Sequence, residues 1–271
     1  MKTKNFKSPA KMNLYLRILD KRNDGFHNLD SSFQLIDLFD QIEITNIDTN
    51  EIEIECNPNI IKTKNNIVYT AVNILRERYK IDKGIRIKIK KNIPIGAGLG
   101  GGSSNAATVL IALNQIWDLK IQIHDLMKIG RALGADVPFF INGENALVSG
   151  IGDVLTKKES DKAKYILICP DISISTKDMF LYLDRKEDYS DDKKEFIQNS
   201  FLQPVCEKYN DIGQFYENNK KSFDVCLTGT GSTMFIRYKD SVELKKIFKI
   251  IPANWRFFLA EPLQYSPLKG V

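Results

Sequence analysis

The sequence predicts an α+β protein with two domains, over residues 1–155 and 156–271. Segments with alternating apolar and polar residues, typical of strands with one solvated face, are interspersed with segments whose apolar residues recur at helical spacing. After a glycine-rich turn at 150–153 the pattern restarts with an apolar strand, which indicates a second unit. The chain has 271 residues, of which 43% are hydrophobic, so it can form one large core or two modest ones.

The first predicted strand covers residues 11–18, where apolar and polar side chains alternate. Lys11 and Asn13 therefore point toward the same face. Two further alternating segments, 41–44 and 51–56, predict an antiparallel pair of strands.

A turn and a helix follow from local signals. The Asp-Gly dipeptide at 24–25 predicts a turn that presents Phe26 and His27 directly after it. Farther along, Asn65 or Asn66 is placed to cap the first predicted helix.

Residues 94–107 (PIGAGLGGGSSNAA) have the chemistry of a phosphate cradle. Glycine tolerates positive φ and has no Cβ, so backbone N–H groups in such a loop approach an anion closely. Apolar residues from 106 to 117 recur at helical spacing, which places Ser103 and Ser104 in the first helical turn, where free N–H donors favour phosphate. We assign a metal-binding hydroxyl to Ser104. The predicted nucleotide-binding residues are Pro94, Gly96, Gly98, Leu99, Gly100, Gly101, Gly102, Ser103, Ser104 and Asn105.

Two better-known phosphate motifs do not fit this loop. It contains a literal G-x-G-x-x-G at 96–101, but the preceding segment, 85–91, alternates apolar and basic residues, whereas a Rossmann strand is buried on both faces. A Walker A loop requires a lysine where this chain has Gly102. A plain surface turn is the remaining alternative, but it would not require so many glycines beside a helix.

Composition limits the function classes. The net charge is +5, but lysines are interleaved with acidic residues, which indicates a solvated surface rather than a nucleic-acid site. The mixed-charge segment at 184–195 predicts an exposed loop. No apolar run is long enough to span a bilayer, and the N-terminus lacks a signal-peptide core, so we expect a cytoplasmic protein. Four cysteines without C-x-x-C spacing predict buried free thiols.

The remaining elements complete the two domains. A helix over 125–133 ends at Gly134, and Asp136 follows in a corner where Pro138 is expected to stop the helix before a strand. A hairpin, a helix and a strand then give the pattern of a split β-α-β sandwich. Its predicted parts are strands at 165–169, 224–227, 233–238 and 255–260, a glycine-rich turn at 228–232, and a helix from about residue 241.

At this point the residues resemble a known family. The segment at 94–107 matches P-x-x-x-G-L-G-G-G-S-S-[ND]-A-A, the central motif of the GHMP kinases. SPAKMNLYL (8–16), DGFHNLDSSFQLID (24–37), GADVPFF (134–140) and LTGTGST (227–233) are similar, in order and spacing, to the branch that phosphorylates the 2-hydroxyl of a cytidylated methylerythritol. The resemblance therefore extends over nearly the whole chain.

The resemblance implies a two-domain GHMP kinase fold. It pairs an N-terminal ribosomal-protein-like α/β domain, which binds ATP, with a C-terminal ferredoxin-like split β-α-β domain. It implies ATP and Mg²⁺ as cofactors and a small-molecule acceptor. We expect no nucleic-acid partner and no membrane partner, and a monomer or homodimer.

The resemblance also implies roles for single residues. Lys11 and Asp136 would meet at the acceptor hydroxyl, with Asp136 as a general base or an orienting acceptor. Phe26, which replaces a tyrosine common in the family, and Phe180 would sandwich the cytosine ring, and His27 would bond the base edge. The other expected acceptor-site residues are Asn13, Thr176, Gly229, Thr230 and Gly231.

Other interpretations stay open at this stage. Lys11 fits a surface lysine, Asp136 a capping carboxylate, and the two phenylalanines fit core positions. Another GHMP kinase, such as a homoserine kinase, would have no need of a cytosine pocket. A basic nucleotide- or RNA-binding module would show steeply salt-dependent RNA binding and no ATP turnover.

Overall fold

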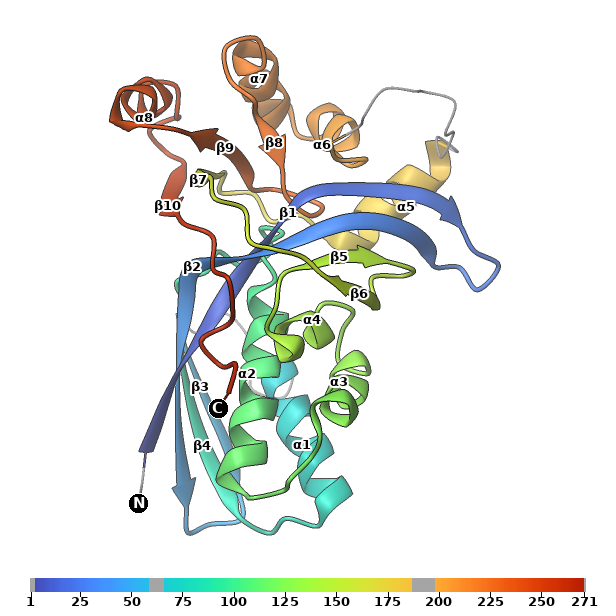
Figure 1. Cartoon of the computed structure of the whole chain (residues 1–271), viewed down its shortest axis with the longest axis vertical. Coiled ribbons are helices and arrows are strands. Elements are labelled where there is room, and N and C mark those ends of the chain that lie inside the picture. Colours follow the sequence, from blue (N-terminus) through green and yellow to red (C-terminus); the bar gives the residue numbers. More distant parts are fainter. Residues whose placement is uncertain (1–2, 59–65, 187–197, 271) are drawn as a thin grey trace.

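A computed structural model describes residues 3–58, 66–186 and 198–270. Figure 1 shows that they form two sheets, each with helices packed beside it. The mixed α and β composition and the presence of two sheets confirm the predicted fold class. Among the described residues no helix combines the length and apolarity needed to cross a bilayer. All four cysteines are free thiols, as predicted, but only Cys169 and Cys226 are fully buried.

The first sheet has the strand order β3-β4-β2-β5-β6, with β1 paired to β2. Its strands are β1 (Thr3–Lys21), β2 (His27–Ile47), β3 (Ile52–Asn57), β4 (Gly84–Lys90), β5 (Ala146–Ser149) and β6 (Val154–Lys157). The expected antiparallel pair of the 41–44 and 51–56 segments is wrong, because β4 lies between β2 and β3. β4 is antiparallel to β2 and parallel to β3, since the helical crossover after β3 returns the chain in the same direction.

Four helices cover one face of this sheet (Figure 1). They are α1 (Ile67–Tyr79), α2 (Gly101–Ile116), α3 (Ile123–Arg131) and α4 (Val137–Asn142). The side chain of Asn66 caps α1 by accepting a hydrogen bond from the Val68 amide at 3.0 Å, while Asn65 lies outside the described residues. The isoleucines of β4 are buried and Lys88 and Lys90 are exposed, which confirms a strand with one solvated face.

The corner around Asp136 differs from the prediction. Pro138 lies in the first turn of a new helix and is not followed by a strand. Proline is tolerated there because the N–H group that it lacks would have no partner within the helix at this position. Asp136 therefore stands at the start of α4, and the chain returns to the sheet only at β5.

The second sheet has the order β10-β7-β9-β8, with antiparallel neighbours throughout. Its strands are β7 (Lys164–Cys169), β8 (Cys226–Leu227), β9 (Met234–Tyr238) and β10 (Arg256–Ala260), and its helices are α5 (Thr176–Lys186), α6 (Leu202–Lys208), α7 (Asn210–Asn219) and α8 (Ser241–Phe248). This order confirms the ferredoxin-like split β-α-β arrangement. α6 and α7 were not predicted. The charged segment is helical at 184–186, and 187–195 lies outside the described residues.

The two sheets share a core through β1. Met12 and Leu14 of β1 pack with Leu167 of β7 and Phe235 of β9. Farther along the strand, Leu16 joins the core beneath the helices of the second sheet. A domain boundary at residue 155, which falls within β6, stays a prediction.

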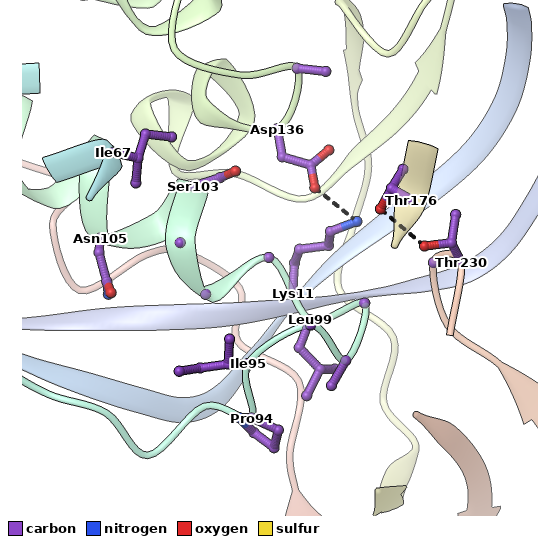
Figure 2. Close-up of a pocket in the computed structure, with 18 of the residues that line it drawn as sticks. Lys11, Ile67, Pro94, Ile95, Leu99, Ser103, Asn105, Asp136, Thr176 and Thr230 are labelled. Atoms are coloured by element: carbon purple, nitrogen blue, oxygen red, sulfur yellow. Dashed lines mark hydrogen bonds and ion pairs between the residues drawn. The ribbon is translucent and has the colours of Figure 1, made fainter. Parts of the chain in front are cut away.

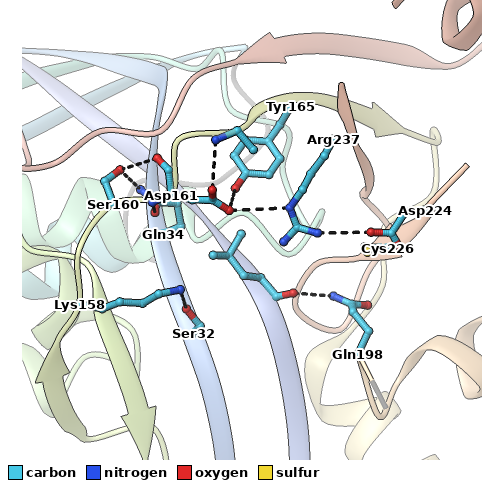
Figure 3. A network of polar contacts seen from close by, with 12 residues as sticks. Ser32, Gln34, Lys158, Ser160, Asp161, Tyr165, Gln198, Asp224, Cys226 and Arg237 are labelled. Carbon is cyan, nitrogen blue, oxygen red and sulfur yellow. Dashed lines mark hydrogen bonds and ion pairs between the residues drawn. The ribbon is translucent and has the colours of Figure 1, made fainter. Parts of the chain in front are cut away.

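A polar network ties the link between β6 and β7 to both sheets (Figure 3). The buried Gln34 side chain of β2 accepts a hydrogen bond from the Asp161 amide at 2.9 Å. The Asp161 carboxylate in turn accepts a hydrogen bond from the Tyr165 hydroxyl at 2.6 Å and faces Arg237 of β9 at 3.7 Å. This network fixes the path of the chain between the sheets.

Candidate active site

A cavity of about 570 Å³ lies where the glycine loop, β1, the start of α4 and the 228–232 turn converge (Figure 2). The residues that line it are far apart in the sequence, from Lys11 to Thr230. The predicted site residues among its lining are Lys11, Asn13, Pro94, Gly96, Gly98, Leu99, Gly100, Gly101, Gly102, Ser103, Asn105, Asp136, Thr176, Phe180, Gly229 and Thr230.

Lys11 and Asp136 meet in this cavity. The Lys11 ammonium is 3.2 Å from the Asp136 carboxylate and donates a 2.8 Å hydrogen bond to the Asn13 amide oxygen. The Lys11 side chain is only 5% exposed, and its Nζ lies 4.2 Å from the centroid of the Phe33 ring, so Lys11 is not a surface lysine. The Asp136 side chain makes no capping hydrogen bond to α4 and is 29% exposed. Its carboxylate is therefore open to the cavity and held by Lys11.

Asn13 is itself held in one orientation by a residue that the sequence analysis missed. Ser31 of β2 donates to the Tyr15 carbonyl oxygen at 2.6 Å and accepts from the Asn13 amide nitrogen at 2.8 Å. Because that nitrogen faces Ser31, the amide oxygen faces Lys11. The Asn13 backbone N–H donates to the Thr228 hydroxyl at 2.8 Å, which joins β1 to the second glycine-rich turn.

The glycine loop has the backbone that the sequence predicts. Gly96, Gly98 and Gly100 have φ values of +66°, +76° and +70°. A Cβ at Gly100 would lie 2.8 Å from the Phe140 ring, and one at Gly98 would lie 2.6 Å from the Thr228 carbonyl oxygen. The loop is thus packed closely from both sides, which a surface turn would not be.

Helix α2 begins two residues earlier than Ser103, with Gly101 and Gly102 in its first turn. A Cβ at Gly102 would meet no atom within 4 Å, so the backbone is open to the cavity at this point. This combination of open backbone and helix N-terminus is suited to a phosphate group.

The two serines of this turn lie in different surroundings. Ser103 lines the cavity, whereas Ser104 is fully buried with its hydroxyl 2.8 Å from the Ser8 hydroxyl. The expectation that Ser104 presents its hydroxyl to a metal ion therefore does not agree with the structure. The reason is geometric, because adjacent helical residues point about 100° apart and only one of the two can face the ligand.

A buried polar cluster beneath the loop was also missed. The Asp40 carboxylate, fully buried, accepts hydrogen bonds from the backbone amides of Asn92 and Ile93 at 2.8 and 2.9 Å. It also pairs with the Lys91 ammonium and with the Asn105 amide, and both of these residues line the cavity. The cluster holds the strand that leads into the loop, and nothing in the local sequence around Asp40 predicts this role.

At the acceptor end, Phe180 lines the cavity and Phe26 does not, and the expected sandwich of a cytosine between the two rings stays a prediction. Among the described residues the ring contacts of Phe180 are with His27, at 5.0 Å, and Phe201, at 4.9 Å. Phe26 is 58% exposed, so it is not a core residue. The His27 side chain is 6% exposed, and its Nε2 lies 2.7 Å from the Asp184 carboxylate.

The second glycine-rich turn closes the cavity. The hydroxyls of Thr176 and Thr230 are 3.1 Å apart, and Figure 2 shows them facing each other beside the Lys11–Asp136 pair. Gly231 does not line the cavity; it has a φ of +87° and supports the turn from behind.

Comparison with known proteins agrees with this geometry. The family model described as the GHMP kinases N terminal domain matches residues 66–144. The chain is 36% identical to a 4-diphosphocytidyl-2-C-methyl-D-erythritol kinase from Colwellia psychrerythraea, over 98% of this chain and 92% of that protein. It is 40% identical to the kinase of the same name from Acinetobacter baumannii, over 97% of this chain and 96% of that protein.

Solved structures show the same likeness. A 4-(cytidine 5'-diphospho)-2C-methyl-D-erythritol kinase superposes with a TM-score of 0.81 at 26% identity, covering 96% of this chain and 99% of that one. A mevalonate kinase superposes with a TM-score of 0.71 at 15% identity, over 96% of this chain and 99% of that one. The second likeness concerns the fold alone.

Proposed function

Because this chain belongs to the 4-diphosphocytidyl-2-C-methyl-D-erythritol kinases of the GHMP superfamily, we propose that its cavity transfers the γ-phosphate of ATP to the 2-hydroxyl of that cytidylated polyol. The chain is an ATP-dependent small-molecule kinase of isoprenoid precursor synthesis. The observation that carries the proposed site is the Lys11–Asp136 pair. It lies between the glycine loop, suited to a triphosphate, and the Thr176 and Phe180 side chains of α5.

The proposed chemistry is a direct displacement at phosphorus. The acceptor oxygen forms a bond to the γ-phosphorus as the bond from that phosphorus to the bridging β–γ oxygen breaks, and ADP leaves. Asp136 accepts the proton of the attacking hydroxyl. Lys11 holds that carboxylate in place and offsets negative charge at the transferring group. Asn13 and Ser31 fix the Lys11 ammonium, so the pair is oriented before the substrates bind.

The residues present fit a magnesium ion carried in with the nucleotide. Within the described ranges no three His, Cys, Asp or Glu side chains are grouped to hold a metal by themselves. Mg²⁺ commonly keeps several waters and binds through substrate phosphates with one or two protein oxygens. We assign the Ser103 hydroxyl as such an oxygen, in place of Ser104. The bound ion would neutralise charge on the β- and γ-phosphates.

The proposed location is the cytoplasm, where ATP is available and the four free thiols would stay reduced. The activity itself is tested by an ADP-release assay with two acceptors, the cytidylated polyol and homoserine. We expect turnover with the first and none with the second. Turnover with homoserine and none with the cytidylated polyol would show that the acceptor assignment is wrong. RNA binding without ADP release would overturn the kinase assignment.

A further inference from the structure

Helix α5 presents two side chains to the β1–β2 hairpin. Phe180 and Asp184 are four residues apart, so they lie one above the other on the same helix face. Phe180 lines the cavity, and Asp184 lies one turn farther from it. The acceptor end of the cavity and the Asp184 contact are therefore parts of one surface between the helix and the hairpin.

Asp184 is bound by both strands of that hairpin. Lys21 of β1 and His27 of β2 are directly opposite each other in the strand register. The Lys21 ammonium is 2.8 Å from one carboxylate oxygen of Asp184, and His27 Nε2 is 2.7 Å from the other. A single carboxylate thus joins the end of β1, the start of β2 and α5.

The charge and packing at this contact suit a fixed position. Partial burial opposes ionisation, but hydrogen bonds from Lys21 and His27 outweigh it and lower the pKa of Asp184. The His27 ring packs against Phe180 with centroids 5.0 Å apart. The residue before His27 is the exposed Phe26, so the position of the hairpin also sets the position of Phe26 relative to Phe180.

We propose that Asp184 is a positioning residue for the cytidylated acceptor, acting through Lys21 and His27 to hold the hairpin against α5. By this contact it sets the distance between Phe26 and Phe180, the two aromatic rings available to a cytosine. The inference rests on the proposed function, because it takes a pyrimidine-bearing acceptor as the ligand. Lys21, His27 and Asp184 are not among the residues that line the cavity beside the glycine loop, so we expect the contact to leave ATP binding unchanged.

Asp184→Asn tests the proposal, because asparagine keeps the shape and removes the charge that binds Lys21 and His27. We expect the KM for the cytidylated acceptor to rise about tenfold, the scale of a lost charge-assisted hydrogen bond. The turnover number and the KM for ATP should not change. Asp178→Asn is the matched control, since Asp178 is an exposed residue in the first turn of the same helix and should leave all three constants unchanged.

Two further measurements separate positioning from general stability. Lys21→Met should raise the same KM, and the double variant with Asp184→Asn should show less than the product of the two effects. Asp184→Glu should restore part of the affinity. A lowered melting temperature with unchanged acceptor KM would make Asp184 a structural residue and overturn the proposal.

Calorimetric binding of cytidine diphosphate separates this inference from the proposed function. Binding does not require turnover, so Asp184→Asn should weaken it about tenfold even in a preparation without activity. A parent protein that binds cytidine diphosphate but phosphorylates no cytidylated polyol would overturn the proposed function only. Equal affinity of the parent and Asp184→Asn proteins would overturn the role of Asp184.

Discussion

The Lys11 ammonium lies 3.2 Å from the Asp136 carboxylate, and each residue is held by a different element of the fold. Lys11 comes from β1, where Asn13 and the Phe33 ring fix its side chain. Asp136 comes from the start of α4, where Pro138 sets the helix entry. An ion pair assembled from two rigid elements is oriented before substrate binding, which is the main requirement of phosphoryl transfer.

Replacing Asp136 by asparagine tests the role of this carboxylate. Asp136→Asn keeps the volume but removes the proton acceptor, so the turnover number should fall by roughly 10² to 10⁴. The affinity for both substrates should change little. Initial rates at saturating substrate, with affinities measured by calorimetry, check this. Near-normal turnover would return Asp136 to the role of a capping or turn residue.

The partner residue provides the second arm of that experiment. Lys11→Met should also lower the turnover number. The double variant with Asp136→Asn should lose less turnover than the two separate effects combined, because the residues act as a unit. Independent, additive losses would show that Lys11 acts on another group.

The serines at the start of α2 form a natural pair of test and control. Ser103→Ala should raise the KM for ATP and the Mg²⁺ concentration needed for activity, because of the two serines only Ser103 lines the cavity. Ser104→Ala should leave the KM for ATP unchanged and lower the melting temperature instead, since its hydroxyl contacts Ser8 in the interior. Kinetics over a range of Mg²⁺ concentrations, beside thermal unfolding, distinguish the two. The reverse result would restore the assignment of the metal to Ser104.

Local sequence signals were sufficient for most elements of the fold. The glycines at 96–102 require a special backbone whatever surrounds them, and Asn66 caps α1 through its own nearest amides. The pairing of β3 with β4 was not predictable in this way, because alternation identifies a strand without identifying its neighbour. The direction of that pair is set by the crossover through α1.

The candidate site was predictable only as far as its motifs extend. Asp40 and Ser31 have no motif of their own, and their roles come from contacts with Lys91 and Asn13 across the fold. Ser104 shows the opposite limit, since a motif gives the residue type but not which of two neighbouring hydroxyls faces the ligand. Both cases depend on side-chain direction, which tertiary packing determines.

The network around Asp161 predicts a dependence of stability on pH. Burial opposes ionisation of Asp161, but hydrogen bonds from Tyr165 and Ala163 and the charge of Arg237 lower its pKa below the ordinary 3.8. A carboxyl with a lowered folded-state pKa stabilises the fold above its unfolded-state pKa, and this contribution is lost as the pH falls through the folded-state value. At neutral pH, Asp161→Asn should therefore lower the free energy of unfolding by about 1–2 kcal/mol.

Urea unfolding of the parent and Asp161→Asn proteins at neutral pH and at about pH 3 checks this. The difference between them should shrink at the lower pH, because the parent carboxyl is then becoming protonated as well. Asp224, exposed and farther from the core of the network in Figure 3, provides Asp224→Asn as a control with a smaller effect. An equal difference at both pH values would show that the Asp161 charge does not contribute.

The exposed ring of Phe26 gives the most direct test of the acceptor. Stacking of a base on an aromatic side chain contributes about 1–3 kcal/mol to binding. Phe26→Ala should therefore lower the affinity for the cytidylated substrate by roughly tenfold to a hundredfold. Because Phe26 is 58% exposed, this change should leave the melting temperature unchanged. Phe26→Tyr keeps the aromatic face and should bind as well as the parent.

The hairpin also offers a matched control for Phe26. Leu19, on β1 of the same hairpin, is 39% exposed, and Leu19→Ala removes a similar apolar surface without removing a ring. It should leave both substrate affinities unchanged, while Phe26→Ala should change only that of the acceptor, since the triphosphate is assigned to the glycine loop. His27→Ala should weaken binding of the acceptor as well, because it removes the contacts of the hairpin with both Phe180 and Asp184. If Phe26→Ala and Leu19→Ala prove equivalent, Phe26 does not stack on the base, and cytosine recognition must depend on Phe180.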